Sequence, residues 1–136
     1  MRIKLDDGAI KPSRAHKEDA GVDLYTPERV VLRAHDSVTI DTGVHFEIPE
    51  GWAGFIKSKS GLNVKHGIIA DGTIDSGYTG SVVVKLYNLG DKMHIFEAGD
   101  KITQIVFEKV ECCDFEVVDE IESGERGDNG FGSSGV

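Results

Sequence analysis

Between residues 38 and 48, apolar and polar side chains alternate with a period of two, and this pattern constrains the fold more than any other. The residues of one parity are apolar or small: Val38, Ile40, Thr42, Val44, Phe46 and Ile48. Polar side chains fall between them, among them Thr39, Asp41, His45 and Glu47. Because successive side chains of a strand point to opposite faces of a sheet, the pattern predicts a half-buried strand pair with a bulge or bend at 41–43.

Further short strands are expected around this pair. After a turn at 49–51, runs rich in apolar residues predict strands at 30–32, 52–56, 81–87 and 101–107. Only 61–66 has the character of a helix, with Ser60 as its N-cap and Gly67 after its last turn. Together with 17 glycines and frequent turn signals, these features predict an all-β sandwich or barrel.

The chain is acidic and has the size of one domain. Its 136 residues can bury one hydrophobic core, and no repeat or linker divides them. With 15 Lys and Arg against 24 Asp and Glu, the net charge is −9, which disfavours nucleic acid and anionic membranes as partners. A small polyanion is still a suitable ligand wherever positive charge gathers locally.

A cytoplasmic location is expected. No apolar run approaches the roughly 20 residues that cross a bilayer, and the first residues lack the apolar stretch of a signal peptide. The only cysteines, Cys112 and Cys113, are adjacent, which excludes a disulfide framework and fits a reducing compartment. We expect both to be buried structural residues, as free cysteines usually are.

Residues 123–136 differ in composition from the rest of the chain. They contain five glycines, three serines and one aromatic residue, too little apolar surface for a core. We therefore predict a β-barrel domain at 1–122 and a flexible, glycine-rich C-terminal arm at 123–136. By composition alone, the arm is either a frayed tail or a segment that closes over a ligand.

Two internal segments gather polar groups that a scaffold does not need. Residues 57–62 (KSKSGL) open the expected helix with ammonium, hydroxyl and backbone N–H groups, which suits an anion. The alternative is a solvated lysine pair at a strand end. In residues 72–80 (GTIDSGYTG), three glycines bracket Asp75, which can orient or deprotonate water, and Tyr78, whose ring can pack on a sugar. The alternative there is an ordinary hairpin turn.

Together with Asp23, residues 99–104 and the arm, these segments resemble the five ordered motifs of the trimeric dUTP pyrophosphatase (dUTPase) family. The matching stretches are AGVDL at 20–24, SKSGL at 58–62, GTIDSGYTG at 72–80, GDKITQ at 99–104 and RGDNGFGSSG at 126–135. They follow the family's order and span nearly the whole chain. The resemblance implies a distorted jelly-roll (β-clip) barrel with one short helix, assembled as a homotrimer with shared active sites. It also implies magnesium-assisted hydrolysis of dUTP to dUMP and pyrophosphate.

The resemblance assigns roles to residues around the base and sugar. Asp75 would activate the attacking water and bind the 3'-hydroxyl. Tyr78 would pack on deoxyribose and leave no room for a 2'-hydroxyl. The backbone of Gly72, Thr73 and Ile74 would read uracil.

The other implied roles concern the phosphates and the arm. Asp23 would hold Mg2+ through its waters. The substrate phosphates would be bound by Lys59, Ser60, Gly61 and Gln104. In the arm, Phe131 would stack on uracil, and the remaining substrate-binding residues would be Arg126, Gly132, Ser133 and Ser134, with Arg126 and the two serines on the outer phosphates.

The chain departs from the family's pattern at several positions. Lys59 stands where arginine is usual, so a planar bidentate contact becomes a point charge. Ser58 replaces a common proline, Gly77 replaces the second acid of the hairpin, and Thr103 stands where alanine is common. The stretch 66–72 also looks shorter. We expect these changes to affect affinity and base selectivity more than the reaction class.

Three other functions are alternatives for a chain with this sequence. A dCTP deaminase shares the fold, but its chemistry calls for a glutamate, and none lies near Asp75 in the hairpin. A regulatory protein could keep the fold and bind a protein partner in a nucleotide-dependent way, so turnover is needed to separate it from an enzyme. A structural β-domain with a disordered tail would require five coincidental motifs.

Overall fold

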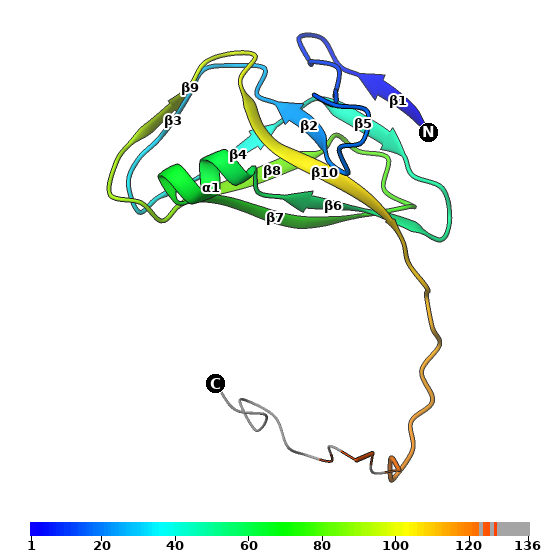
Figure 1. The fold of residues 1–136 in the computed structure, drawn as a ribbon. Coiled ribbons are helices and arrows are strands. Elements are labelled where there is room, and N and C mark those ends of the chain that lie inside the picture. The colour runs from blue at the N-terminus through cyan, green and yellow to red at the C-terminus, as the bar shows by residue number, and fades with distance from the viewer. Residues whose placement is uncertain (123, 126, 128–136) are drawn as a thin grey trace.

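The structure, a computed structural model, describes residues 1–122, 124, 125 and 127. These residues form ten short strands and one short helix (Figure 1). The main sheet is antiparallel and has six strands, in the order β2 (Val22–Tyr25), β10 (Lys101–Lys109), β6 (Trp52–Lys57), β7 (Ile68–Asp75), β8 (Val83–Asn88) and β4 (Ser37–Asp41).

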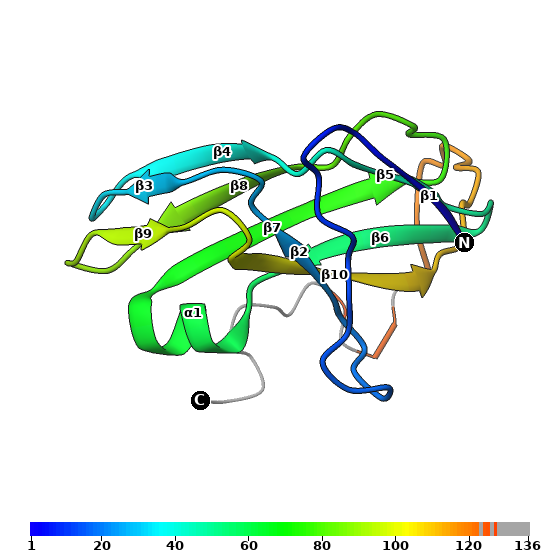
Figure 2. The same ribbon diagram turned by 90° about the horizontal axis from the view of Figure 1, so that it is seen from above.

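Two antiparallel ribbons complete the fold. One pairs β1 (Arg2–Leu5) with β5 (Val44–Glu47), and the other pairs β3 (Val30–Leu32) with β9 (His94–Phe96). The ribbons lie at opposite ends of the curled main sheet (Figures 1 and 2). The predicted all-β class with one short helix is confirmed.

The alternation at 38–48 is confirmed as two strands, β4 and β5, but they do not pair with each other, because β4 pairs with β8 and β5 pairs with β1. Ile40, Val44 and Phe46 are buried in the common core, whereas Asp41 is exposed and His45 is half-buried. The predicted bend falls at Gly43, whose φ of 65° lies in the left-handed region that glycine adopts without strain. Beside it, the buried Thr42 donates its hydroxyl to the carbonyl of Val82 at 2.8 Å.

Four predicted strands are confirmed with small shifts of their ends, as β3, β6, β8 and β10. The strand β7 was missed, because residues 72–80 were interpreted as a turn or loop from their glycines. Its residues 71–75 contain Gly72 and two aspartates, residue types that are depleted in strands. The segment 72–80 is therefore half strand and half loop.

The single helix, α1 (Ser60–His66), is confirmed, and Gly67 ends it in the left-handed conformation with its N–H donated to Asn63 O at 2.8 Å. The prediction that Ser60 is the N-cap is wrong. Ser60 is the first helical residue, Lys59 occupies the N-cap position, and no described side chain caps the helix. The backbone N–H groups of the first turn therefore still need partners.

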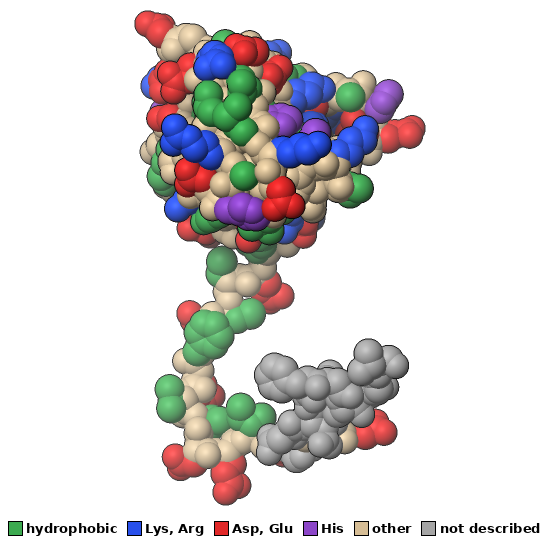
Figure 3. Space-filling model, turned by 90° about the vertical axis from the view of Figure 1, so that its left-hand side faces the viewer, with side chains coloured by type: hydrophobic (Ala, Val, Ile, Leu, Met, Phe, Trp, Pro, Cys, Tyr) green, Lys and Arg blue, Asp and Glu red, His purple; other side chains and the backbone are tan. Residues whose placement is uncertain are grey.

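After β10 the chain leaves the sheet. Residues 110–122 contain no helix or strand and project from the body with apolar side chains uncovered, Phe115 and Val117 among them (Figures 1 and 3). The expectation that Cys112 and Cys113 are buried is wrong, because both lie in this projecting segment and are exposed. Among the described residues, no helix is long and apolar enough to span a membrane.

Candidate active site

The candidate residues form two groups at opposite ends of the β6–β7 ladder. In that ladder Asp75 faces Ala53, whereas Asp71 faces Lys57. Four residues of strand separate the two levels, which corresponds to about 13 Å. We call the group near Lys57 the lysine cluster (Asp23, Lys59, Lys101 and Gln104), and the group near Asp75 the hairpin pocket (Thr73, Ile74, Asp75, Tyr78 and Val83).

Strand register assembles the lysine cluster. Gln104, on β10, lies opposite Asp23 of β2 on one side and opposite Lys57 of β6 on the other. Lys59 follows β6 by two residues, and Lys101 lies near the start of β10. Residues far apart in the sequence are therefore aligned across three neighbouring strands.

Asp23 is the centre of this cluster. Its carboxylate is almost fully buried and accepts hydrogen bonds from Lys59 Nζ at 2.5 Å and Lys101 Nζ at 2.7 Å. Burial alone would raise the pKa of Asp23, but the hydrogen bonds from Lys101 and Lys59 outweigh it and hold the pKa below its ordinary value. The same contact raises the pKa of Lys101. Asp23 therefore stays ionised and fixes two ammonium groups.

Ser58 and Thr103, two residues that depart from the family pattern, bind the backbone around the segment between β6 and α1. Ser58 Oγ donates to the carbonyl of Ala70 at 3.1 Å and accepts the N–H of the same residue at 2.9 Å. Thr103, buried on β10, donates to the carbonyl of Lys57 at 2.7 Å. Both hydroxyls therefore support the backbone that carries Lys59, a role that sequence reasoning did not find.

Gln104 supports the same segment from the other side. Its Nε2 donates to the carbonyl of Ser58 at 3.1 Å. Gly21 makes room for it, because a Cβ at that position would lie 2.0 Å from Gln104 Oε1. A side-chain amide has two N–H groups, so one is left for a ligand.

The first turn of α1 borders the lysine cluster and is open. Ser60 and Gly61 are exposed, and a Cβ added to Gly61 would meet no atom within 4 Å. Packing therefore does not require glycine at this position. The N–H groups of this turn directly follow Lys59 in the chain, and together with its positive charge they suit an anion.

The hairpin pocket is a cavity of about 200 Å³ where β7 leads into the loop at 76–82. Asp75 is the last residue of β7, is exposed, and its carbonyl accepts the N–H of Tyr78 at 3.1 Å. The Tyr78 hydroxyl donates to the carbonyl of Ser81 at 2.9 Å. A Cβ at Gly80 would lie 2.4 Å from Tyr78 Oη, so glycine is needed to seat the ring.

The edge of β7 beside this pocket is open. The ladder between β7 and β8 joins Ile68–Ala70 to Leu86–Asn88, and from 71 to 75 the only pairing among the described strands is with β6. Alternate residues of an antiparallel strand point their backbone groups to opposite sides, so the N–H and C=O groups within 72–74 that do not bond to β6 face a free edge. An edge of alternating donors and acceptors can bind a planar base.

Asp23 is the described residue that best fits contact with a magnesium ion. Among the described residues, no group of three or more His, Cys, Asp and Glu side chains could bind a metal directly. The Asp23 carboxylate has about four acceptor positions, of which the two lysines use two. The remaining positions fit contact with metal-bound water, and Mg2+ is commonly held by few carboxylates together with substrate phosphates.

The predicted residues of the arm, Arg126, Phe131, Gly132, Ser133 and Ser134, lie outside the described residues. Within the described part, the structure brings Asp75, Tyr78 and the 72–74 edge together. It separately brings Asp23, Lys59 and Gln104 together, next to Ser60 and Gly61. Sequence reasoning missed Lys101, although it lies inside the GDKITQ segment that was singled out.

The chain matches known proteins over its full length. A family model described as dUTPase matches residues 7–135. A Clostridium acetobutylicum protein named deoxyuridine 5'-triphosphate nucleotidohydrolase is 41% identical over 136 residues, covering 98% of this chain and 94% of that protein. A Thermobifida fusca protein of the same name is also 41% identical over 136 residues, covering 97% of this chain and 76% of the other.

Solved structures give the same result. The dUTPase of Staphylococcus bacteriophage 80alpha with dUpNHpp superposes with a TM-score of 0.89 at 32% identity, covering 99% of this chain and 98% of that one. A mutant dUTPase of phage phi11 of S. aureus has a TM-score of 0.80 at 27% identity, covering 88% and 96%. The phi11 structure is described as revealing the coordination of a structural Mg(II) ion.

Proposed function

This chain belongs to the dUTPase family and is a dUTP diphosphatase, and from that premise we propose which residues carry the hydrolysis of dUTP to dUMP and pyrophosphate. The observation that carries the assignment is the hairpin pocket. An exposed carboxylate, a tyrosine ring and a free strand edge meet there within one cavity. These three features suit hydrolysis of a deoxynucleotide: the carboxylate for the attacking water, the ring for the sugar and the strand edge for the base.

Asp75 is the proposed general base. It accepts a proton from the water that attacks the α-phosphorus, while the bond from that phosphorus to the pyrophosphate oxygen breaks. Its position at the end of β7 next to Tyr78 supports this role, since the carboxylate then lies beside the sugar. A positioned base of this kind contributes about 10²–10⁴-fold to rate.

Substrate selection is assigned to the other parts of the hairpin pocket. The Tyr78 ring packs on deoxyribose and leaves no space for a 2'-hydroxyl. The backbone of Gly72, Thr73 and Ile74 reads the edge of uracil. The missing β8 partner from 71 onward supports this assignment, because paired backbone groups could not bind a base.

The lysine cluster and the start of α1 are the proposed phosphate site. Lys59 supplies positive charge, while Gln104 and the N–H groups near Ser60 and Gly61 supply donors. Asp23 holds Lys59 in place and is also proposed to hold Mg2+ through water. When bound, the ion neutralises charge that develops on the departing pyrophosphate.

We further propose a homotrimer whose active sites combine residues of different subunits. The separation of about 13 Å along one ladder supports this, because a single chain does not bring Asp75 next to Lys59. The arm residues Arg126, Phe131, Gly132, Ser133 and Ser134 are proposed to close over the nucleotide. The two exposed, unpaired cysteines support a cytoplasmic location.

A regulatory role is the second candidate. The phage 80alpha structure is described with the statement that phage dUTPases control transfer of virulence genes by a proto-oncogenic G protein-like mechanism. That statement concerns the phage proteins. If this chain binds the nucleotide but does not hydrolyse it, we propose that it binds a protein partner in a nucleotide-dependent way.

Pyrophosphate release is the test of the proposed function. It should be measured with dUTP, dCTP, dTTP and UTP, each with magnesium and with excess chelator. Magnesium-dependent release from dUTP alone is the expected result. Release from dCTP as well would contradict strict uracil selection, and no release from any nucleotide would contradict the enzymatic role.

A further inference from the structure

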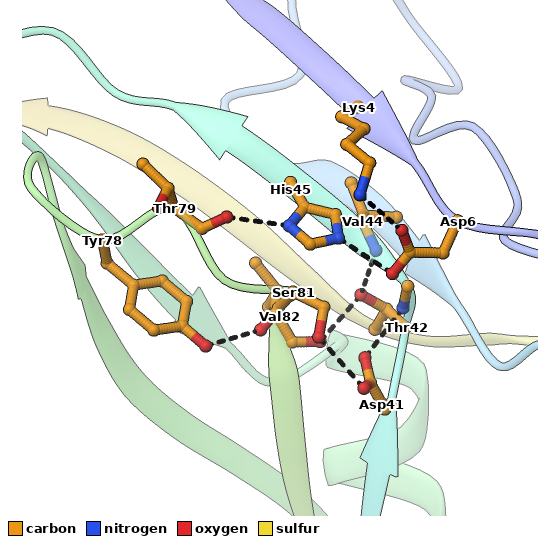
Figure 4. A network of polar contacts seen from close by, with 11 residues as sticks. Lys4, Asp6, Asp41, Thr42, Val44, His45, Tyr78, Thr79, Ser81 and Val82 are labelled. Atoms are coloured by element: carbon orange, nitrogen blue, oxygen red, sulfur yellow. Dashed lines mark hydrogen bonds and ion pairs between the residues drawn. The ribbon is translucent and has the colours of Figure 1, made fainter.

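The loop at 76–82, which carries Tyr78, is held from behind by side chains from around the β4–β5 bend (Figure 4). Ser81 Oγ donates to Asp41 Oδ2 at 3.0 Å. His45, on β5, makes a second contact, with its Nδ1 lying 2.8 Å from the carbonyl oxygen of Thr79. Thr79 directly follows Tyr78, so His45 holds the backbone beside the tyrosine.

The second ring nitrogen of His45 also faces an acceptor. Nε2 lies 2.8 Å from Asp6 Oδ2, just beyond β1, and the His45 side chain is only 18% exposed. A backbone carbonyl and a carboxylate accept hydrogen bonds but cannot donate them. A neutral imidazole has only one N–H. Only the imidazolium form of His45 can therefore make both contacts.

The charges around His45 favour this form. The hydrogen bond to Asp6, followed by that to the Thr79 carbonyl, raises the pKa of His45. Hydrogen bonds from Lys4 and His45 hold the pKa of Asp6 below its ordinary value, so Asp6 stays ionised. Lys4 opposes His45 protonation, but its Nζ lies 2.9 Å from Asp6 Oδ1. On the same face, Glu47 and Arg2 pair with each other.

Loss of the proton would affect the two contacts unequally. The single remaining proton would stay on Nε2, because a hydrogen bond to a carboxylate is stronger than one to a neutral carbonyl. The lone pair of Nδ1 would then face the lone pairs of Thr79 O. The loop would lose this attachment beside Tyr78, although the contacts of Ser81 and Thr42 would remain.

We propose that His45 is a positioning residue, which as an imidazolium holds Thr79 and thereby sets Tyr78 against the nucleotide sugar. This inference rests on the proposed role of Tyr78 in the hairpin pocket. The contact is complete at low pH and is lost as the pH rises through the raised pKa of His45, above its ordinary value of about 6.5. Nucleotide affinity should therefore weaken on the alkaline side, with KM affected more than kcat.

Two substitutions separate the contacts. The amide nitrogen of asparagine lies as many bonds from Cβ as Nδ1 does, so His45→Asn keeps a donor for Thr79 that does not titrate. The amide nitrogen of glutamine corresponds to Nε2, so His45→Gln keeps only the donor toward Asp6. Asp6→Asn is a third variant, which keeps an acceptor but removes the charge that favours the imidazolium.

The experiment measures two quantities between pH 6 and 9. One is the Kd of dUpNHpp. The other is amide hydrogen exchange of residues 78–81 in the free protein, corrected for the intrinsic rate. In the unmodified protein, both affinity and protection should fall about fivefold with rising pH, the effect of losing one hydrogen bond. With His45→Asn, affinity and protection should stay high at every pH. With His45→Gln, both should stay low at every pH. Asp6→Asn should shift the midpoint of the pH dependence to lower pH.

Several results would overturn the proposal. One is protection of 78–81 that does not change with pH in the unmodified protein. Another is identical behaviour of His45→Asn and His45→Gln. A pH-dependent loop with unchanged dUpNHpp affinity would also overturn it, because the loop would then not position the nucleotide. If protection and affinity follow the expected pattern but dUTP is not hydrolysed, the positioning role stands and the proposed enzymatic function fails.

Discussion

At Asp23 one buried carboxylate is shared by two ammonium groups, so the residue has a structural role in addition to any contact with a metal. Its two partners are Lys101 and Lys59, which stands where arginine is usual in the family. Lysine offers a point charge on a flexible stem, and its position depends on its partners more than that of arginine does. Asp23 therefore compensates for the substitution by fixing the direction of Lys59.

The pairing predicts a pH-dependent contribution of Asp23 to stability. Its folded-state pKa is depressed, so the contribution is present above the unfolded pKa and is lost as the pH falls through the folded value. Asp23→Asn should lower the free energy of unfolding at pH 7 by about 1.5–3 kcal/mol, the value of hydrogen bonds to a charged group. The difference should shrink below about pH 4.

Urea unfolding with chelator present at pH 7, 5 and 3 measures this effect. Asp71→Asn is the control, because Asp71 is exposed and its Lys57 contact is long, at 3.8 Å. A loss of stability in Asp23→Asn that is equally large at pH 3 would show that the ion pair is not its cause.

Asp75 gives the second prediction at the scale of a residue. Asp75→Asn keeps the shape of the side chain but removes its ability to take a proton, so kcat should fall by about 10²–10⁴-fold. The Kd of dUpNHpp should stay within about threefold, because binding depends on other contacts. Single-turnover kinetics and calorimetry measure the two quantities, with Asp71→Asn again as the control. Near-normal turnover in Asp75→Asn would rule out Asp75 as the base.

At the scale of an element, the hairpin formed by β7, its loop and β8 contains both a paired and an unpaired region. Pairing with β8 stops at Ala70, and the freed edge then borders the cavity that Tyr78 helps to line. Gly80 allows the tyrosine ring to fold back over its own loop. The hairpin is thus shaped by backbone geometry as much as by its side chains.

Gly80 and Gly77 offer a matched pair of substitutions in this loop. Gly80→Ala places a Cβ 2.4 Å from Tyr78 Oη, so the ring must move, whereas a Cβ at Gly77 meets no atom within 4 Å. Gly80→Ala should therefore reduce the preference for dUTP over UTP about tenfold or more, within the range for loss of packing at one sugar contact. Gly77→Ala should leave it unchanged.

The ratio of kcat/KM for the two nucleotides measures this preference, and thermal unfolding shows whether the fold is kept. Both variants should unfold close to the unmodified protein, because Tyr78 is an exposed residue. Unaltered discrimination in Gly80→Ala would contradict sugar packing by Tyr78.

The elements differ in how well the sequence predicts them. Strands β4 and β5 were predictable because each strand buries one face, which leaves an alternating pattern. β7 was not, since Asp71, Gly72 and Asp75 serve an open edge and lack strand propensity. Ser58 and Thr103 were noted only as departures, because their partners are backbone carbonyls that become neighbours through strand register.

At the scale of the whole molecule, the distribution of charge matters more than its sum. The chain carries a net charge of −9, yet Lys59 and Lys101 are gathered at one end of the sheet. Asp75 lies at the other end of the β6–β7 ladder. The motifs were predicted from sequence as one site, but the distance between the two groups within one chain follows only from strand register.

This separation predicts that two inactive variants restore each other. Asp75→Asn damages only the hairpin pocket, and Lys59→Met damages only the lysine cluster. If each site combines the two groups from different subunits, a trimer that contains both variants has about a third of its sites with both groups intact. Co-expressed chains with different affinity tags, purified through both tags, should therefore recover about a third of the unmodified kcat, whereas each variant alone stays nearly inactive. Doubly tagged trimers of Asp75→Asn alone are the control, and mixed trimers no more active than this control would show that each chain builds its site by itself.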